Sequence, residues 1–254
     1  MKIVVLSSGS KGNVTYLETK NKKFLLDAGR NYKYMSEALA DIGVNIKDID
    51  YVLISHNHSD HVAGLKTLLN KTNAALLVSE KLFASLEDLS DFQHIIVLED
   101  EIVLDGIKIK SFKSSHDAPD SRNFVITEED KSVAYVTDTG YVNTKNFSYL
   151  KNLDIYLFES NHDIELLQHG PYPSWLKKRV LSDEGHLSNN SAAFYLTKLI
   201  GVKTKKIILI HLSETNNNEQ VALDTIHNTF KEYNVDFTNI SCARQNEKTE
   251  VIEI

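Results

Sequence analysis

The chain has 254 residues, of which 42% are hydrophobic and 25% are charged, proportions that are typical of a globular protein. Its net charge of −7 weakens non-specific attraction to nucleic acid but does not exclude it, because carboxylates that bind cations contribute to this sum. No apolar run approaches the roughly 18 residues of a membrane-spanning helix. The single cysteine, Cys242, excludes an intrachain disulfide.

The sequence shows no sign of targeting or of several domains. Residues 1–6 lead directly into a predicted strand without a cleavable signal pattern, so we expect a cytoplasmic protein. No Pro-rich or Ser-rich linker and no low-complexity segment interrupts the chain. We therefore expect residues 1–254 to form one domain.

The chain begins with three predicted strands, at residues 2–7, 14–19 and 23–29. The turn at 8–13 is rich in Gly and Asn, which suits a simple hairpin connection. Its backbone N–H groups and Ser10 could instead bind a substrate phosphate. Asp27, near the end of the third strand, carries a charge that is costly to bury without a partner.

The densest polar motif is Ser-His-Asn-His-Ser-Asp-His at residues 55–61. A predicted strand at 51–54 precedes it and a helical apolar pattern follows, so the motif lies on a strand-to-helix turn. His56 and His58 should converge, because side chains two apart on an extended turn point the same way. Asp60 and His61 are expected to point elsewhere. One loop therefore offers two sets of metal ligands, which suits two neighbouring ions.

Other elements in this half follow from apolar spacing and turn residues. Residues 32–42 are predicted to form an amphipathic helix closed by Gly43. The remaining expected elements are a helix at 62–70, a strand at 74–78, a short helix at 79–86 with Ser79 as its N-cap, and a strand at 94–98.

Four later strands also lead directly into residues that can bind metals. These residues are His116 after a hairpin at 101–112 that turns at Asp105-Gly106, Asp138 after a hairpin at 122–136, Glu159 after a strand at 154–158 and His211 after a strand at 206–210. Catalytic groups on strand-end loops are typical of layered α/β scaffolds. The pattern indicates one active site rather than unrelated polar residues.

The stretch 164–200 is predicted to be helical, with a break at Pro171 and Pro173 and a basic helix at 174–182. The basic residues of that helix are Lys177, Lys178 and Arg179. They form either a solvated face or a surface for backbone phosphates. The last elements expected are a helix at 218–233 and short strands near Ile240 and Val251.

An HxHxDH motif directly after an apolar strand resembles the metallo-β-lactamase fold superfamily. Six short sequence motifs resemble those of its YycJ/WalJ/VicX branch of nucleases: SGSKGN, LLDAG, ESNHD, HGPYPSWLKKR, GHLSN and HLSETNN. This resemblance extends over nearly the whole chain. It implies an α/β (α+β) fold, specifically the four-layer αββα sandwich of that superfamily.

The resemblance also implies two divalent metal ions per chain. It assigns His56, His58 and His116 to one ion, Asp60, His61 and His211 to the second, and Asp138 to both. Imidazole and carboxylate donors without a thiolate suit Zn or Mn, with Fe as a further option. In the family, the position of Asp27 buttresses the histidine loop, a supporting role that is common around metal sites.

Three features favour phosphodiester cleavage within this versatile superfamily. Glu159 and His186, in ESNHD and GHLSN, resemble a ribonuclease Z pair that protonates the leaving oxygen, although Glu159 could instead support the metal ligands. The basic helix could hold phosphates, and the SGSKGN and HLS motifs match those of nuclease-like members. The expected catalytic residues are Asp60, Glu159 and His186, and the expected substrate-binding residues are Ser10, Asn13, Lys177, Lys178, Arg179 and Ser213.

The YycJ-like branch is generally described as 5′-to-3′ DNA exonucleases, so the resemblance implies a DNA substrate attacked by a metal-bridging hydroxide. The chain has no room for the insert domain of the β-CASP nucleases and lacks the arm that ribonuclease Z uses for tRNA. Two alternatives stay open. One is a hydrolase of a small cyclic phosphodiester or thioester on the same dimetal site, and the other is a non-enzymatic regulator.

Overall fold

The computed structural model describes residues 1–254, apart from the side chain of Glu87. The chain forms two compact units. One contains residues 1–111, 118–122 and 244–254, and the other contains residues 112–117 and 123–243. The expected single domain stays a prediction. Within the described part of the chain, no helix is both long enough and apolar enough to cross a membrane.

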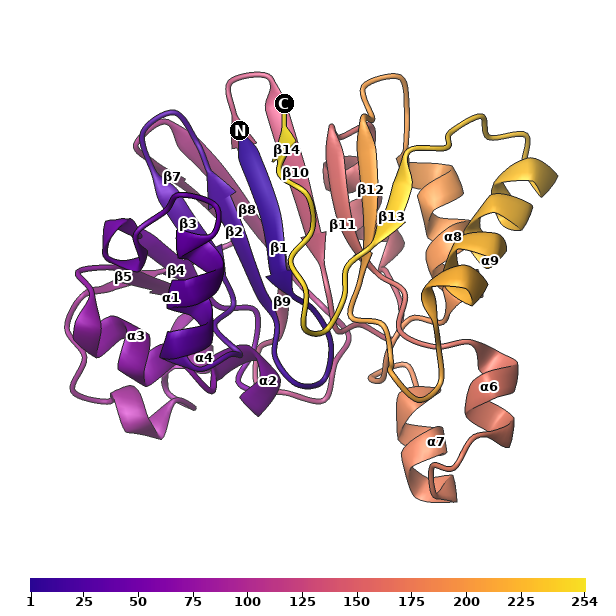
Figure 1. Ribbon diagram of the computed structural model, residues 1–254, viewed down its shortest axis with the longest axis horizontal. Helices are drawn as coiled ribbons and strands as arrows, with labels where there is room; N and C mark the ends of the chain where they lie inside the picture. Colours follow the sequence, from indigo (N-terminus) through magenta and orange to yellow (C-terminus); the bar gives the residue numbers. More distant parts are fainter. The chain divides into compact units, whose positions relative to one another are not determined.

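A seven-stranded sheet forms the centre of the first unit (Figure 1). Its strands, in spatial order, are β14 (Ile252–Glu253), β1 (Lys2–Ser7), β2 (Val14–Glu18), β3 (Lys23–Leu26), β4 (Tyr51–Leu53), β5 (Ala75–Val78) and β6 (Ile95–Val97). Strands β1 to β3 pair antiparallel, whereas β3 to β6 pair parallel. Strand β5 is apolar and buried at every position, as expected for a parallel strand covered on both faces.

Short helices bury their apolar sides against this sheet. They are α1 (Tyr32–Ala40), η1 (Ile46–Asp48), α2 (Ser59–Val62), α3 (Leu65–Lys71), α4 (Glu80–Phe83) and η2 (Glu87–Leu89). Met35, Leu68 and Leu82 join the hydrophobic core from α1, α3 and α4. Ser79 caps α4 by accepting a hydrogen bond from the backbone of Leu82, so the predicted N-cap is confirmed.

The helix predicted at 62–70 is two helices, α2 and α3, separated at Gly64. A Cβ atom at Gly64 would lie 1.9 Å from the backbone oxygen of Arg30, so this close approach of two backbones requires glycine. Helix α2 already begins at Ser59. Asp60 and His61 therefore lie inside a helix rather than ahead of it.

A second seven-stranded sheet has, in spatial order, the strands β13 (Ile240–Cys242), β12 (Lys206–Ile210), β11 (Ile155–Glu159), β10 (Lys131–Val136), β9 (Arg122–Glu128), β8 (Ile107–Lys113) and β7 (Glu101–Leu104). The predicted hairpin turn between β7 and β8 is confirmed. Asp105 and Gly106 there have φ values of 52° and 82°, the left-handed conformation that such two-residue turns need.

Strands β10, β11, β12 and β13 of the second unit run parallel. Their register places Val136 beside Phe158 and Glu159 beside Ile210. Because parallel strands reach the same edge of a sheet at their carboxyl ends, the loops after β10, β11 and β12 start close together.

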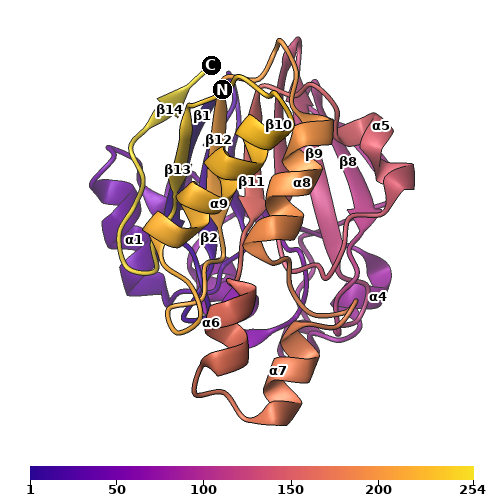
Figure 2. The same cartoon turned by 90° about the vertical axis from the view of Figure 1, so that its right-hand side faces the viewer.

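Helices cover this sheet as well. They are η3 (Thr144–Asn146), α5 (Phe147–Leu150), α6 (Ile164–His169), α7 (Ser174–Val180), α8 (Asn189–Leu199) and α9 (Glu219–Glu232). Helices α8 and α9 lie side by side along the sheet (Figure 2), and their Leu196 and Ile226 share a core with Tyr156 of β11. The predicted helix break at Pro171 and Pro173 is confirmed, because both prolines lie between α6 and α7.

Candidate metal centre

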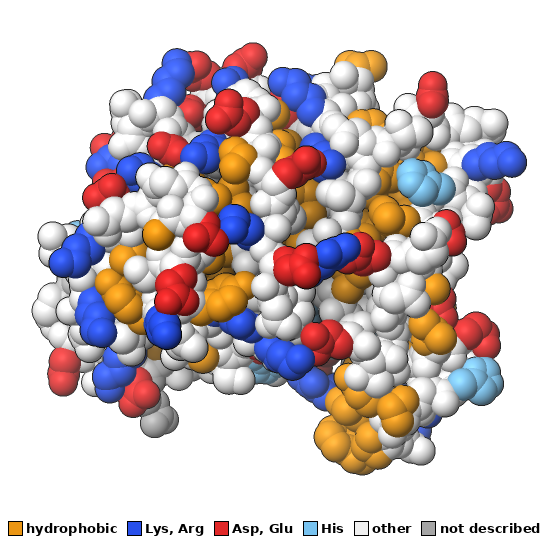
Figure 3. Space-filling view, viewed as in Figure 1, with side chains coloured by type: hydrophobic (Ala, Val, Ile, Leu, Met, Phe, Trp, Pro, Cys, Tyr) orange, Lys and Arg blue, Asp and Glu red, His pale blue; other side chains and the backbone are white. Residues whose placement is uncertain are grey.

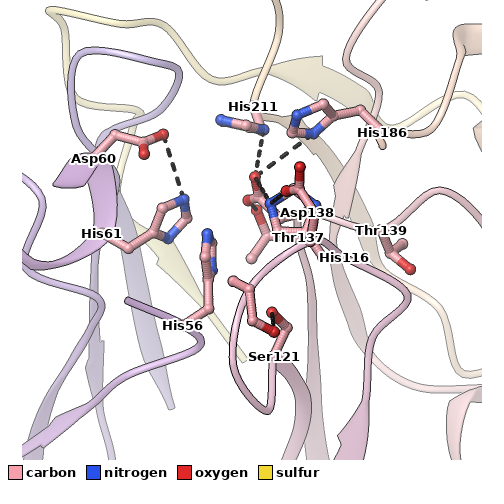
Figure 4. Close-up of polar contacts among 12 residues, drawn as sticks. His56, Asp60, His61, His116, Ser121, Thr137, Asp138, Thr139, His186 and His211 are labelled. Carbon is pink, nitrogen blue, oxygen red and sulfur yellow. Dashed lines mark hydrogen bonds and ion pairs between the residues drawn. The ribbon is translucent and has the colours of Figure 1, made fainter. Parts of the chain in front are cut away.

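The histidine loop of the first unit joins β4 to α2. His58 is the N-cap residue of α2, and His61 lies in its last turn. The ring centroid of His56 lies 4.7 Å from that of His58 and 4.0 Å from that of His61. The expectation that His61 points away from His56 is therefore wrong, because the helical turn of α2 brings its ring back. Asp60 Oδ2 lies 3.6 Å from His61 Nε2 (Figure 4).

Asp27 stabilises this loop through hydrogen bonds to Ser55 and His61. Its completely buried carboxylate accepts hydrogen bonds from the backbone N–H of Ser55 at 2.8 Å and from the Ser55 hydroxyl at 2.9 and 3.0 Å. Asp27 Oδ2 also lies 2.7 Å from His61 Nδ1. Since an ionised carboxylate only accepts, Nδ1 of His61 donates, and Nε2 is the ring nitrogen that would bind an ion.

The Gly-rich turn after β1 also contacts the histidine loop. Asn13 is buried, and its Nδ2 lies 3.0 Å from His61 Nε2 and 3.4 Å from Asp60 Oδ2. Its Oδ1 accepts a hydrogen bond from the backbone N–H of Gly9 at 2.8 Å. Ser10, by contrast, lies exposed on the same turn. The expected substrate-binding roles of Ser10 and Asn13 stay predictions.

The second unit also contains a polar cluster. Asp138, Glu159, His186 and His211 each offer one ligand atom, and these four atoms lie within 4.8 Å of one another. Asp138 Oδ1 is 3.4 Å from Nδ1 of His211 and 3.6 Å from Nδ1 of His186 (Figure 4). The same oxygen lies 3.7 Å from Nε2 of His116. Four strand-end residues predicted from the sequence therefore meet, with His186 beside them.

Glu159 links two imidazoles through one oxygen. Its Oε1 lies 2.7 Å from His186 Nδ1 and 3.1 Å from His211 Nδ1, while Oε2 accepts backbone hydrogen bonds from Thr139 and Leu187 at 2.9 and 3.2 Å. Complete burial by itself raises the pKa of Glu159, but the charge of His186 and the hydrogen bonds from both imidazoles outweigh it and lower the pKa to about 2. Glu159 is therefore a fixed anionic acceptor.

A common arrangement of ring nitrogens indicates that these histidines fit metal ions. Nδ1 faces a fixed oxygen in three of the expected ligands: Asp27 for His61, the Gly185 carbonyl at 3.1 Å for His116, and Glu159 for His211. Such partners orient an imidazole and raise the basicity of its other nitrogen, Nε2. The donors are nitrogen and oxygen atoms, the chemistry that suits Zn, Mn or Fe.

Backbone conformation contributes to this geometry. Asp27, Asp138 and His211 have φ values of 59°, 46° and 58°, the left-handed region that residues other than glycine rarely adopt. Each directly follows, or lies two residues beyond, the last residue of a strand. The sharp bend stores strain in the backbone of all three residues, and such strain concentrates at functional sites.

The three basic residues of α7 have different surroundings. Arg179 forms a two-pronged ion pair with Asp117 at 2.5 and 2.8 Å, and the ammonium of Lys177 donates to the Gln168 carbonyl at 2.8 Å. Lys178 is exposed and has no hydrogen bond or ion pair among the described residues. The sequence reasoning missed Asp117, whose only signal is its position next to His116.

Two further residues lie beside the cluster. Ser213 is largely buried and accepts a hydrogen bond from the backbone N–H of Asn216 at 3.1 Å, which is a local turn contact. His162 is buried, and burial lowers its pKa to about 4, so the ring is neutral at physiological pH. Neither ring nitrogen of His162 has a hydrogen-bond partner among the described residues.

The chain is similar in sequence to two proteins that are named exodeoxyribonucleases. The exodeoxyribonuclease WalJ of Streptococcus pneumoniae is 41% identical over 234 residues, which cover 89% of this chain and 87% of that protein. The exodeoxyribonuclease YycJ of Bacillus anthracis is 36% identical over 233 residues, covering 90% of this chain and 88% of that protein.

Solved structures share the fold at low sequence identity. The metallo-β-lactamase fold protein YhfI from Bacillus subtilis has a TM-score of 0.71 at 16% identity, covering 98% of this chain and 99% of its own. Zinc-bound PqqB from Methylobacterium extorquens has the same TM-score and identity, covering 98% and 100%. The predicted fold class is therefore confirmed. The model of the Metallo-beta-lactamase superfamily matches residues 8–211, and the chain belongs to that superfamily.

Proposed function

We propose that this protein is a metal-dependent exodeoxyribonuclease that degrades DNA from the 5′ end. The relatives that cover about nine tenths of the chain are named exodeoxyribonucleases, which supports the substrate class. The structural observation that carries the reaction type is the buried cluster of Asp138, Glu159, His186 and His211. It combines groups that can bind a cation with an imidazole that is placed to transfer a proton.

We assign two divalent ions to the expected ligands, with Zn or Mn preferred and Fe as a further option. One ion would be held by His56, His58 and His116, the second by Asp60, His61 and His211, and Asp138 would contact both. When bound, the ions would activate water and stabilise the negative charge that develops on the phosphoryl group. The partners at Nδ1 of His61, His116 and His211 support this assignment.

The residues of the chain then supply orientation and proton transfer. His186 donates its Nδ1–H to Glu159, so its Nε2 is the atom that would hold the transferable proton. The departing sugar oxygen is a poor leaving group at neutral pH and needs that proton. Glu159 fixes the orientation and the tautomer of His186. Asp60 would contribute as one of the residues that hold the second ion.

Substrate binding requires positive charge outside the metal ligands, because the chain as a whole is acidic. Lys177, Lys178 and Arg179 supply it on the last turn of α7. Lys178 is the exposed one of the three and has no hydrogen bond or ion pair within the described part of the chain, so it is the best placed for a phosphate. Ser10, Asn13 and Ser213 are proposed to contribute hydrogen bonds to the substrate.

Digestion of end-labelled oligonucleotides tests this proposal. Chelated protein, reloaded separately with Zn, Mn or Fe, should release mononucleotides from 5′-labelled DNA first and should act less on RNA of the same sequence. Bis-p-nitrophenyl phosphate and a thioester serve as small-molecule comparisons. Turnover of a small substrate without any DNA cleavage under any metal would contradict a nuclease and favour a small-molecule hydrolase.

A further inference from the structure

Helix α7 exposes an aromatic side chain that the proposed metal chemistry does not use. Trp175, the only tryptophan of the chain, is 67% exposed, the highest value for any aromatic side chain among the described residues. Leu166 of α6 and Leu181 at the end of α7 are also exposed. Hydrophobic side chains gather over this part of the second unit (Figure 3). Indole rings are highly buried on average, and exposed ones are enriched at binding surfaces.

Positive charge lies next to this ring. Trp175 and Lys178 are three residues apart on α7, and therefore lie on neighbouring positions of one helix face. The charge is moderate, because Arg179 is already paired with Asp117, and Asp183 and Glu184 follow in the next loop. Charge attraction alone would therefore bind a polyanion weakly at this surface. The indole ring of Trp175 must contribute much of the binding free energy of any ligand.

The end of α7 is attached to the residues of the candidate site. The backbone N–H of His186 donates to the Val180 carbonyl at 3.1 Å, and the Gly185 carbonyl lies 3.1 Å from His116 Nδ1. A Cβ atom at Gly185 would lie 2.2 Å from the Val180 oxygen, so this loop packs tightly against the helix end. Helix α7 and His186 therefore keep a fixed relation within the second unit.

The distance along the helix suits a short piece of one strand. Trp175 lies five residues before Val180, which is about 7.5 Å along the helix axis. The stretch of helix between Trp175 and Val180, whose carbonyl accepts the His186 backbone N–H, therefore has the length of about two stacked nucleotides at roughly 3.4 Å each. Every nucleobase has a flat π-face, so an aromatic ring flanked by cations binds single strands without sequence preference.

We propose that Trp175 stacks on an unpaired nucleobase of the DNA strand whose end is processed at His186, while Lys178 neutralises a nearby phosphate. The inference rests on the proposed function, because it assumes a nucleic-acid substrate at that site. It adds that this substrate is single-stranded over its last few nucleotides.

The single tryptophan makes the test direct. Metal-loaded protein is titrated with a phosphorothioate single-stranded oligonucleotide that resists cleavage, while the intrinsic fluorescence of Trp175 is recorded. We expect quenching that saturates with binding, and weaker quenching by a blunt duplex of the same sequence. Trp175→Ala and Trp175→Leu should bind the single strand at least about tenfold more weakly in an anisotropy assay, whereas Trp175→Phe should keep most of the affinity.

Controls separate this inference from the proposed function. Phe194→Ala, at a ring that is 43% exposed on α8, should leave DNA affinity unchanged. Phe194→Ala should also hydrolyse bis-p-nitrophenyl phosphate like the parent. Quenching by the phosphorothioate strand, together with no cleavage of the unmodified strand under any metal, would overturn the nuclease and keep the stacking site. Unchanged DNA affinity in Trp175→Ala would overturn the stacking site, and a concurrent loss of self-association would identify the surface as a contact between copies of the chain.

Discussion

Nδ1 of His186 lies 2.7 Å from Oε1 of Glu159, and the same oxygen also holds His211 at 3.1 Å. One buried carboxylate therefore orients the proposed proton donor and a proposed metal ligand together. The sequence left two roles open for Glu159, assistance to proton transfer or support of the metal ligands. The structure shows a contact for each role, with His186 for proton transfer and with His211 for support of a metal ligand. Variants that distinguish the two roles must therefore change one of these imidazoles at a time.

His186→Ala should lose about 10²–10⁴-fold in DNA cleavage while keeping both metal ions. The loss should be much smaller for a substrate with a nitrophenolate leaving group, which departs without a proton. Steady-state rates on both substrates, together with elemental analysis, provide the measurement. Equal losses on the two substrates would contradict the proton transfer, and loss of metal would show that His186 supports the ions instead.

Asp138→Ala should reduce the metal content from two ions per chain to one or none. Asp138 lies within 3.4–3.7 Å of His116, His186 and His211, so its carboxylate is placed to bind and to offset the repulsion between two cations. Elemental analysis after exhaustive dialysis measures the content. Asp224→Asn, at an exposed carboxylate of α9, is the matched control and should keep both ions. Unchanged metal content in Asp138→Ala would contradict the assignment.

Asp27→Asn should weaken metal affinity about 10–100-fold, the usual effect of losing an orienting partner. An asparagine can still accept a hydrogen bond from the Ser55 backbone with its Oδ1. Its amide Nδ2 would then face Nδ1 of His61, so two donors meet and the imidazole must change tautomer or turn. Competition with a chromogenic chelator measures the affinity. Equal affinities in the variant and the parent would show that His61 does not need this partner.

The placement of the site on strand ends could be predicted from the sequence. Apolar runs define β10, β11 and β12, and the residue after each run is fixed by the chain itself. Because these strands are parallel, Asp138, Glu159 and His211 must meet at one edge. The predicted placement of the histidine motif between a strand and a helix is also confirmed, because it joins β4 to α2.

Contacts between distant segments could not be read in the same way. The sequence gives no local sign that Gly64 divides a helix against Arg30, or that Arg179 pairs with Asp117. The approach of His61 to His56 depends on where α2 begins, which is set by that packing. Left-handed backbone at Asp138 is likewise imposed by its surroundings, since local preference disfavours it.

Lys178→Gln should weaken DNA binding and lower the slope of log affinity against log salt by about one unit, the signature of one lost phosphate contact. Arg179→Gln should change the slope less, because its guanidinium is already engaged by Asp117. Reversal of all three charges at 177–179 should raise the dissociation constant further. Anisotropy titrations at several salt concentrations measure these slopes. A triple variant that binds like the parent at every ionic strength would show that this face is merely solvated.

Asp154 connects the pH dependence of stability to the strand that delivers Glu159. Asp154 directly precedes β11. Its buried carboxylate accepts hydrogen bonds from the Ser132 backbone and hydroxyl, each at 2.9 Å, and pairs with Lys203 at 2.8 Å. Burial alone would raise the pKa of Asp154, but the hydrogen bonds from Lys203 and Ser132 outweigh it and lower the pKa below its usual value.

A pKa that is lower in the folded state means that the unfolded chain binds the proton more readily. The stabilisation is therefore fully present above the unfolded pKa of about 3.9 and is lost as the pH falls through the lower folded pKa. Asp154→Asn should lower the free energy of unfolding at pH 7 by about 1–3 kcal/mol. Urea unfolding from pH 7 to pH 3 should show this difference shrinking towards acid. A difference that stays constant across the range would mean that Asp154 stabilises β11 through its shape and not through its charge.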